Sequence, residues 1–169
     1  MSGTGTRTFF VSGIRFLCVF LLDKLMAHCI FCDILYGLAP AEFVHQDDLC
    51  GAFMDIHPVN PGHVLVVPRR HVAQLTDLDD LSAGRLMQVA RRVDAALRGS
   101  GLKCEGVNLF LADGRAAGQE VMHVHLHVFP RFLKDGHHLR FGPAYFLPTP
   151  AAELGRNAEL IRSQLGKIK

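Results

Sequence analysis

The sequence has no tryptophan, and aromatic residues of all kinds make up only 8% of its 169 residues. It also lacks an excess of charge, because 18 Lys and Arg face 16 Asp and Glu, for a formal net charge of +2. That balance argues against a protein that holds long nucleic acids by neutralising their phosphates. Cysteine is scarce and odd in number, at five, which argues against a secreted disulfide scaffold and favours reduced thiols or a metal site. A composition of 49% hydrophobic and 20% charged residues is typical of one globular domain.

A strongly apolar run lies near the N-terminus, over residues 8–22. It is short for a transmembrane helix and carries Arg15 in its middle. A secretory signal would end in a small-x-small cleavage site, which does not follow. A packed extra helix is a further alternative, but we favour an extension upstream of a start at Met26. We therefore expect residues 1–25 to be an extension of uncertain status, and 26–169 to form a single domain with a C-terminal tail from about 132.

The chain from Met26 onward alternates turn signals with apolar segments. A capping box over Thr76–Asp79 and apolar residues at helical spacing predict a long helix that ends at Gly99. We expect short helices after Cys29 and after Thr149–Pro150. Strands are predicted over 43–45, 51–54, 63–67, 107–112 and 121–129. Strands segregated in this way favour an α+β domain with a mostly antiparallel five-stranded sheet, one long helix packed on it and a C-terminal helix.

Ten histidines are present, and three of them alternate in one segment, His123, His125 and His127. Side chains alternate faces along a strand, so we expect these three imidazoles to point one way and the apolar residues between them the other way. Imidazole can serve as a nucleophile, an acid or base, or a metal ligand. A solvated polar strand face is the simplest alternative. A three-histidine metal site is another, although ligands two apart on one straight strand cannot easily reach one ion.

This alternating segment resembles the signature of the histidine triad (HIT) family of nucleotide hydrolases and transferases. The resemblance extends, in the expected order, to residues 52–56, 61–68, Gly118-Gln119 and Pro130-Arg131. It covers about Cys29 to Arg131 and implies an α+β fold with an antiparallel sheet, usually paired as a homodimer. It further implies cleavage at the α-phosphate of a purine nucleotide or dinucleotide through a covalent nucleotidyl-histidine, with no cofactor required for catalysis.

The resemblance also implies the roles of individual residues. His125 would be the nucleophile, and a neutral imidazole needs no deprotonation before it attacks. His127 and Gln119 would bond the phosphate or the leaving group as hydrogen-bond donors. Asp55 would hold the ribose hydroxyls, and Ile56 would pack beside the base. The predicted anion-binding loop between Gly114 and Gly118 would bring backbone N–H groups near the phosphate.

Ala112 and Glu120 stand where the branches with phosphoramidase activity usually carry Asn and Ser. The surrounding pattern is closer to the branch that splits dinucleoside polyphosphates, so both a dinucleoside polyphosphate and a nucleoside phosphoramidate remain candidate substrates. Glu120 would repel a phosphate, so we expect its backbone to face the ligand.

Cys29 and Cys32 form a C-x-x-C pair, which by itself is a weak signal shared by metal knuckles and redox motifs. By resemblance to bacterial zinc-containing members of the family, this pair would bind a structural zinc together with His71 and His123. Two thiolates and two imidazoles make a closed tetrahedral site. Buried reduced thiols and a disulfide are the alternatives.

Two rival functions stay open at this point. One is a nucleotide-binding regulatory protein with little turnover, and the other is a zinc-dependent hydrolase with its metal among the triad histidines. Because export would place the thiols in an oxidising compartment, we expect a cytoplasmic protein with no membrane association. The remaining histidines are interpreted as surface or loop residues: His28, His45, His57, His137 and His138.

Overall fold

The computed structural model describes residues 29–138 and 142–168. The predicted N-terminal extension therefore lies outside the described residues. The chain divides into two compact units, the first ending at Asp135 and the second beginning at Gly136. The division falls close to the predicted start of the C-terminal tail at about residue 132. The prediction of one domain over 26–169 stays a prediction.

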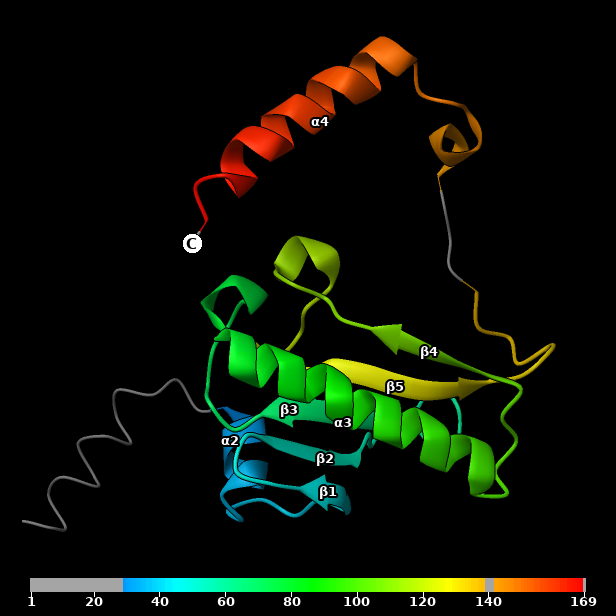
Figure 1. Cartoon of the computed structure of the whole chain (residues 1–169). Helices are drawn as coiled ribbons and strands as arrows, with labels where there is room; N and C mark the ends of the chain where they lie inside the picture. The colour runs from blue at the N-terminus through cyan, green and yellow to red at the C-terminus, as the bar shows by residue number, and fades with distance from the viewer. Residues whose placement is uncertain (1–28, 139–141, 169) are drawn as a thin grey trace, which may run out of the picture. The chain divides into compact units, whose positions relative to one another are not determined.

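The first unit is built on one open sheet of five strands (Figure 1). All four strand pairings are antiparallel. The predicted α+β fold with a five-stranded antiparallel sheet is thereby confirmed. In spatial order the strands are β1 (Phe43–Gln46), β2 (Cys50–Met54), β3 (Val64–Pro68), β5 (Leu126–Arg131) and β4 (Gly106–Phe110).

The long helix α3 (Asp80–Gly99) covers one face of the sheet. It starts later than the predicted capping box. Asp79 is the N-cap and accepts a hydrogen bond from the backbone N–H of Ser82, at 2.9 Å. Residues Leu75–Asp77 form a separate 3-10 turn, η1, instead. Asp79 is as good a cap as Thr76 would be, so the local pattern did not decide between them.

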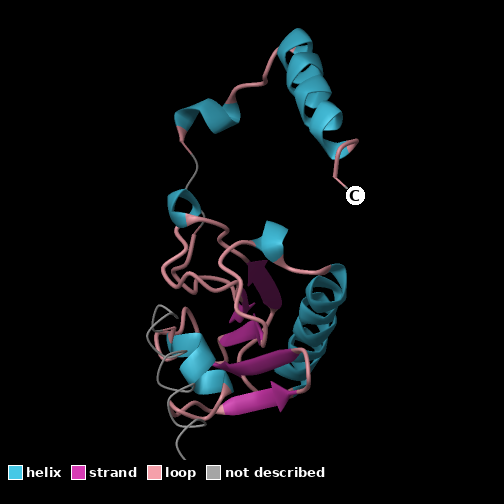
Figure 2. Cartoon of the chain, turned by 90° about the vertical axis from the view of Figure 1, so that its left-hand side faces the viewer, coloured by secondary structure: helices cyan, strands magenta, loops and turns pink. Residues whose placement is uncertain are grey.

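The short helix α2 (Ile30–Leu35) packs on the opposite face of the sheet from α3, as Figure 2 shows. Its buried residues Phe31 and Leu35 contact Phe53, Leu65 and Val67 from the middle strands. The alternate residues of the same strands, such as Val64 and Val66, point to the α3 side. The period-two alternation along β3 thus places one hydrophobic cluster on each face.

The histidine segment departs from the prediction of a single strand over 121–129. β5 begins only at Leu126, so His123 and His125 precede the strand. The pairing of β3 with β5 joins Val64 to Val128 and Val66 to Leu126, and extending it would pair Pro68 with Val124. Proline has no N–H to donate to that ladder. Val124 donates to the carbonyl of Val72 instead, at 2.8 Å. The predicted alternation nevertheless holds on the apolar side, where Val124, Leu126 and Val128 all lie in the α3 cluster.

The second unit contains a 3-10 turn, η3 (Pro143–Phe146), and the helix α4 (Ala151–Leu165). The predicted C-terminal helix is present, although Pro150 is its N-cap and no side chain caps it. Leu154, Leu160 and Leu165 are all exposed. Among the described residues, no helix combines the length and the hydropathy that a membrane span requires.

Candidate functional site

The three triad histidines are gathered at the start of β5. His123 is 0% exposed and His125 is 5% exposed, whereas His127 is only partly buried. The ring centroids of His125 and His127 lie 4.9 Å apart, and the Phe31 ring of α2 meets His125 edge-on at 5.1 Å. His123 faces a different set of partners, Cys29, Cys32 and His71. The three imidazoles are therefore near neighbours but serve two distinct environments.

The protonation of the His125 ring follows from one hydrogen bond. Its Nδ1 lies 2.7 Å from the carbonyl oxygen of His123. A carbonyl oxygen can only accept, so Nδ1 carries the proton and donates. This assignment leaves a lone pair on Nε2. The ring is thus held as the tautomer that a nucleophile requires, with a donor at Nδ1 and a lone pair at Nε2.

His63, which directly precedes β3, is a site residue that no histidine pattern in the sequence indicates. It is 2% exposed, and its Nδ1 accepts a hydrogen bond from the backbone N–H of Val59 at 3.2 Å. Its proton therefore sits on Nε2, which lies 3.0 Å from Nδ1 of His127 and donates to it. His127 in turn carries its own proton on Nε2. The Pro61-Gly62-His63 block was the only signal for this residue, because histidine periodicity does not reach it.

Burial keeps the rings of this chain of hydrogen bonds neutral near pH 7. Removal from water, with smaller contributions from His125 and His63, lowers the pKa of His127 to about 4. Burial also lowers the pKa of His63, against a smaller opposing effect of the nearby Asp55 carboxylate. A neutral His127 is fixed by His63 as a hydrogen-bond donor at Nε2, and its predicted bond to a phosphate stays a prediction.

Asp55 lies next to His63 and His127 and forms a group of titratable residues with them. Its Oδ1 accepts from the backbone N–H of His57 at 2.8 Å, which fixes the carboxylate. Its Oδ2 lies 3.5 Å from Nδ1 of His63 and 3.9 Å from Nδ1 of His127. We call Asp55, His63 and His127 the carboxylate cluster. The neighbouring Ile56 is 86% exposed.

Gln119 is 5% exposed, and its side chain is hydrogen-bonded to two backbone groups. Its Oε1 accepts from the N–H of Gly114 and its Nε2 donates to the carbonyl of Ala73, both at 2.8 Å. Gly114 and Gly118 bracket a 3-10 turn, η2 (Arg115–Ala117), and have φ of 88° and 89°, which favours glycine at both. An amide nitrogen carries two N–H groups, and the bond to Ala73 uses one of them. The predicted contact of Gln119 with phosphate stays a prediction.

A separate group of four side chains, which we call the thiolate cluster, consists of Cys29, Cys32, His71 and His123. Three sulfur-to-nitrogen distances are 3.3 Å (Cys32 to His71), 3.4 Å (Cys29 to His123) and 3.7 Å (Cys32 to His123). Tetrahedral zinc with its usual bond lengths separates sulfur and nitrogen ligands by about 3.5 Å. His123 Nε2 donates to the carbonyl of Pro68 at 2.9 Å, so its Nδ1 presents a lone pair to the sulfurs. The four side chains therefore fit a zinc ion.

The Cys32 thiol of this cluster resists ionisation. Burial, followed by the charge of Cys29, raises the pKa of Cys32 to about 12. Burial also lowers the pKa of His123 to about 4, so its ring is neutral and available as a ligand. All four cysteines in the described part of the chain are free thiols. The disulfide alternative is not what the structure contains.

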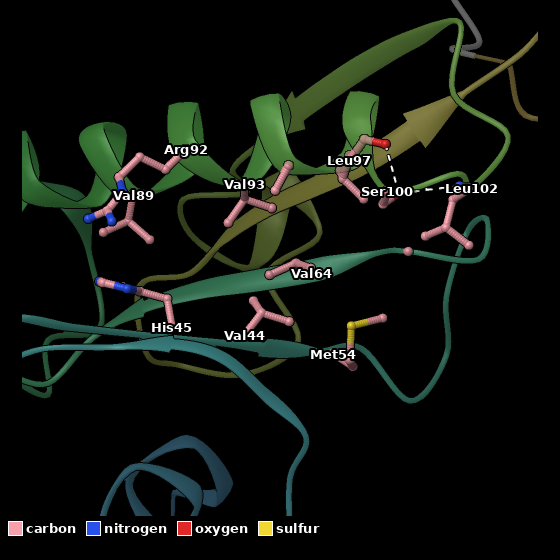
Figure 3. Close-up of a pocket in the computed structure, with 12 residues that line it drawn as sticks. Val44, His45, Met54, Val64, Val89, Arg92, Val93, Leu97, Ser100 and Leu102 are labelled. Atoms are coloured by element: carbon pink, nitrogen blue, oxygen red, sulfur yellow. Dashed lines mark hydrogen bonds between the residues drawn. The ribbon is translucent and has the colours of Figure 1, made fainter.

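A cavity of about 360 Å³ lies away from both clusters, between α3 and the strands β1 to β3 (Figure 3). Val89, Val93 and Leu97 line it from the helix, and Val44 and Val64 line it from the sheet. It lies on the α3 face, whereas His125 contacts Phe31 of α2 on the other face. The cavity is mostly apolar, with His45, Arg92 and Ser100 among its lining residues, and carries none of the triad residues.

Fold and site together define a class of protein, a small open-sheet α+β protein with buried histidines fixed as defined tautomers beside a carboxylate. The family model described as the HIT domain matches residues 37–134, and the chain belongs to the HIT family. A protein of Borreliella burgdorferi named as an uncharacterized HIT-like protein is 42% identical over 112 residues, which cover 66% of this chain and 81% of that protein.

Solved structures support the same assignment. A Zn-bound histidine triad family protein from Mycobacterium smegmatis is 36% identical, with a TM-score of 0.63, and covers 83% of this chain and 97% of its own. A histidine triad nucleotide-binding protein from Candida albicans is 28% identical, with a TM-score of 0.74, over 84% of this chain and 100% of its own.

Proposed function

We propose that this protein is a nucleotide hydrolase or transferase that cleaves at the α-phosphate of a nucleoside phosphate derivative through a covalent intermediate on His125. The observation that carries the proposal is the 2.7 Å hydrogen bond from His125 Nδ1 to the His123 carbonyl. That bond leaves a lone pair on the opposite nitrogen of a buried ring. The name of the Candida albicans neighbour, a nucleotide-binding protein, supports the substrate class.

In the first step, the lone pair of His125 Nε2 forms a bond to the α-phosphorus, and the bond from that phosphorus to the leaving group breaks. A polyphosphate leaving group departs as an anion and needs no proton. The phosphorylated imidazole gains a positive charge, which the His123 carbonyl at Nδ1 stabilises because it accepts that proton's hydrogen bond. His127 Nε2–H donates to the phosphate oxygens as they gain charge.

In the second step, water attacks the α-phosphorus and the bond to His125 Nε2 breaks. The products are a nucleoside monophosphate, the neutral His125 ring and a proton released from the water. A transferase would use another nucleophile in place of water. Splitting the displacement in this way replaces one difficult step by two easier ones, and the second step releases a neutral imidazole that needs no proton to leave.

We further propose that the thiolate cluster binds zinc in a structural role. The ligand types and their separations support this, and so does the Zn-bound relative. Zinc would tie α2 to the segment that carries His123. Because His123 also holds the Nδ1 proton of His125 through its carbonyl, the metal would position the nucleophile indirectly.

Three further parts of the proposal concern substrate, assembly and location. Asp55 would bind the ribose, with a purine nucleotide or dinucleotide as substrate and Ile56 beside the base. A homodimer is supported by the edge strand β4, where Leu109 and Phe110 are 44% and 46% exposed. A reducing cytoplasm is supported by the free thiols. Size-exclusion chromatography with light scattering tests the dimer.

The decisive experiment traps the intermediate. Wild type, His125→Ala, His127→Gln and the exposed-loop control His57→Ala are incubated with diadenosine polyphosphate and with an adenosine phosphoramidate. We expect His125→Ala to lose turnover by about a thousandfold or more, because the nucleophile is gone, while His57→Ala matches wild type. Intact-mass analysis of His127→Gln is expected to show a nucleotidyl adduct that peptide mapping locates on His125. Retained turnover in His125→Ala would refute the mechanism.

A parallel arm with a chelator separates the rival functions. A zinc-dependent hydrolase would lose activity at once when the metal is removed. Under our proposal the first effect of metal loss is on stability, with activity following as the nucleophile loses its position. A regulatory protein would bind the nucleotide and release no product in any arm.

A further inference from the structure

The cavity between α3 and the strands β1 to β3, which we call the α3 cavity, plays no part in the proposed chemistry. Its volume of about 360 Å³ falls within the roughly 300–1,000 Å³ typical of sites for small molecules. Among the described residues, its lining includes none of the triad and none of either cluster. A protein interior is otherwise close-packed, with few voids larger than a water molecule, so a cavity of this size is available to a ligand.

The floor of the α3 cavity is apolar and buried. Val89, Val93 and Leu97 face it from the helix at i, i+4 and i+8 spacing, and Val64 faces them from β3. Ala96 also lines the cavity, and its small side chain leaves space that a larger residue would fill. An alkyl chain suits this floor, because it removes apolar surface from water and needs no hydrogen-bond partner.

The two ends of the α3 cavity differ in charge. Arg92 and His45 lie at one end, and Ser100 and Leu102 lie at the other, as Figure 3 shows. The Ser100 hydroxyl is engaged within the chain, since it donates to the carbonyl of Leu97 at 2.8 Å and accepts from the N–H of Leu102 at 3.3 Å. Formal charge is therefore found at the Arg92 end alone among the described lining residues.

Arg92 supplies a positive charge that its neighbours leave uncompensated. In the part of the chain that the structure describes, it has no ion-pair partner, whereas Arg85 on the same helix pairs with Asp47 at 2.8 Å. His45 is engaged as well, because its Nε2 lies 2.7 Å from a carboxylate oxygen of Asp47. The guanidinium of Arg92 thus stays available for an anionic group, and its fork of N–H donors matches a carboxylate.

We propose that the α3 cavity binds a medium-chain fatty acid, with its carboxylate on Arg92 and its alkyl chain along Val93 and Leu97. Sites for small molecules combine an apolar lining with a few polar groups that fix orientation, and the α3 cavity has this arrangement. Val44 and Leu102 at its rim are 52% and 44% exposed, so the ligand enters from solvent. The cavity lies on the opposite face of the sheet from α2, so this binding does not depend on the proposed function.

The head group is tested with decanoate, decanol and decyltrimethylammonium, which share one alkyl chain and differ in charge. Calorimetric titration of the full chain is expected to show saturable binding of decanoate, binding of decanol weaker by about tenfold or more, and none of the cation. Arg92→Glu should weaken decanoate binding by about tenfold or more, because it reverses the charge at the head group. Arg91→Glu is the matched control, since Arg91 is the exposed neighbour and is not among the lining residues.

The position of the alkyl chain is tested with a second pair of variants. Ala96→Trp places a bulky ring in the cavity and is expected to abolish binding, whereas Ala95→Trp changes an exposed neighbour outside the lining and should bind as wild type does. Methyl NMR of wild type gives independent evidence. Decanoate should shift the signals of Val89 and Val93 and leave that of Val67, on the opposite face of the sheet, unchanged.

Several outcomes would overturn the proposal: no saturable binding of decanoate, equal affinity for decanol, or undiminished binding in Arg92→Glu or Ala96→Trp. Thermal melts check that the variants fold, and the head-group series and the methyl signals need wild type alone. Light scattering tests a different occupant. A chain that binds no decanoate, and whose molar mass falls in Ala96→Trp but not in Ala95→Trp, would assign the cavity to an interface between two copies instead.

Discussion

The thiolate cluster and the carboxylate cluster lie on either side of His125, and they use histidine in different ways. His123 of the thiolate cluster donates from Nε2 to a carbonyl and turns Nδ1 to two sulfurs. His127 of the carboxylate cluster accepts at Nδ1 from another histidine and keeps its proton on Nε2. Residue type is the same in both places. The partner of each ring nitrogen decides whether the ring becomes a ligand, a nucleophile or a donor.

His125 is coupled to both clusters. The carbonyl of His123 holds its Nδ1 proton, and the ring of His127 lies 4.9 Å from its own ring. A change in either cluster should therefore reach the nucleophile, but by different routes. The thiolate cluster should act on stability first, and the carboxylate cluster should act on rate first.

Removing a thiolate should have the largest effect on the folded state. Cys32→Ser is expected to lose bound zinc and to lower Tm by about 10 °C or more, which is roughly 3 kcal/mol for a chain of this size. Elemental analysis of the purified protein and thermal melts measure the two effects. Cys104→Ser is the matched control, because Cys104 lies outside the thiolate cluster and its Sγ donates to the carbonyl of Gly106. A Cys32→Ser protein that keeps its zinc would contradict the assignment of the ligands.

Changing His63 should lower the catalytic rate. It should not remove the zinc-dependent stability, because His63 is not part of the thiolate cluster. His63→Leu removes the donor that fixes the His127 tautomer, and we expect kcat to fall about tenfold or more. His63→Gln supplies another N–H donor at the same place and should recover part of that loss. The ratio of the two variants, measured as kcat at saturating substrate, reports the hydrogen bond rather than packing. Equal rates in the two variants would show that the donor has no role.

The pH dependence of the free energy of unfolding should show whether His127 is buried as a neutral ring. The pKa of His127 falls to about 4 on folding from a usual 6.5, so between these values the unfolded chain binds the proton and the folded chain does not. The free energy of unfolding should therefore decrease as pH falls from about 6.5 to 4. His127→Gln should show a shallower decrease in denaturant titrations. Parallel curves for the two proteins would contradict a buried neutral His127.

The smallest effects should come from two glycines with open space around them. Gly118 has a φ of 89° and no heavy atom within 4 Å of an added Cβ. Gly118→Ala is expected to cost about 1 kcal/mol from backbone strain alone. Gly84 lies inside α3 with similar space, and Gly84→Ala should stabilise by about 0.5–1 kcal/mol because alanine favours a helix. Chemical denaturation of both variants measures the two changes in the free energy of unfolding, which should have opposite signs.

The sheet was largely predictable because its strands are short apolar runs bounded by turn residues. The predicted strands over 43–45 and 51–54 correspond to β1 and β2 within one residue. The prediction was wrong where two signals competed. The triad segment has strand periodicity throughout, yet pairing starts only at Leu126 because Pro68 opposite cannot donate. The start of α3 was predicted at Thr76 but lies at Asp79. Both residue types are good N-caps, so the local sequence did not distinguish them.

The site was predictable only in part. Alternation and resemblance together indicated His125, His127 and the four thiolate-cluster residues, and the structure brings those four together. His63 was missed because it lies far from the triad in sequence and joins it only through the pairing of β3 with β5. The amide of Gln119 is hydrogen-bonded to the backbone of Gly114 and of Ala73, and its predicted contact with a phosphate stays a prediction.

The order of apolar and polar residues already determined the antiparallel α+β architecture and the presence of a histidine-rich segment with apolar residues between. That is possible because burial of one face is a local property of a period-two pattern. Only the tertiary structure decided which nitrogen of each imidazole holds its proton. The atoms that make this choice, the carbonyls of Pro68 and His123 and the N–H of Val59, belong to the backbone, and every sequence has such groups at every position.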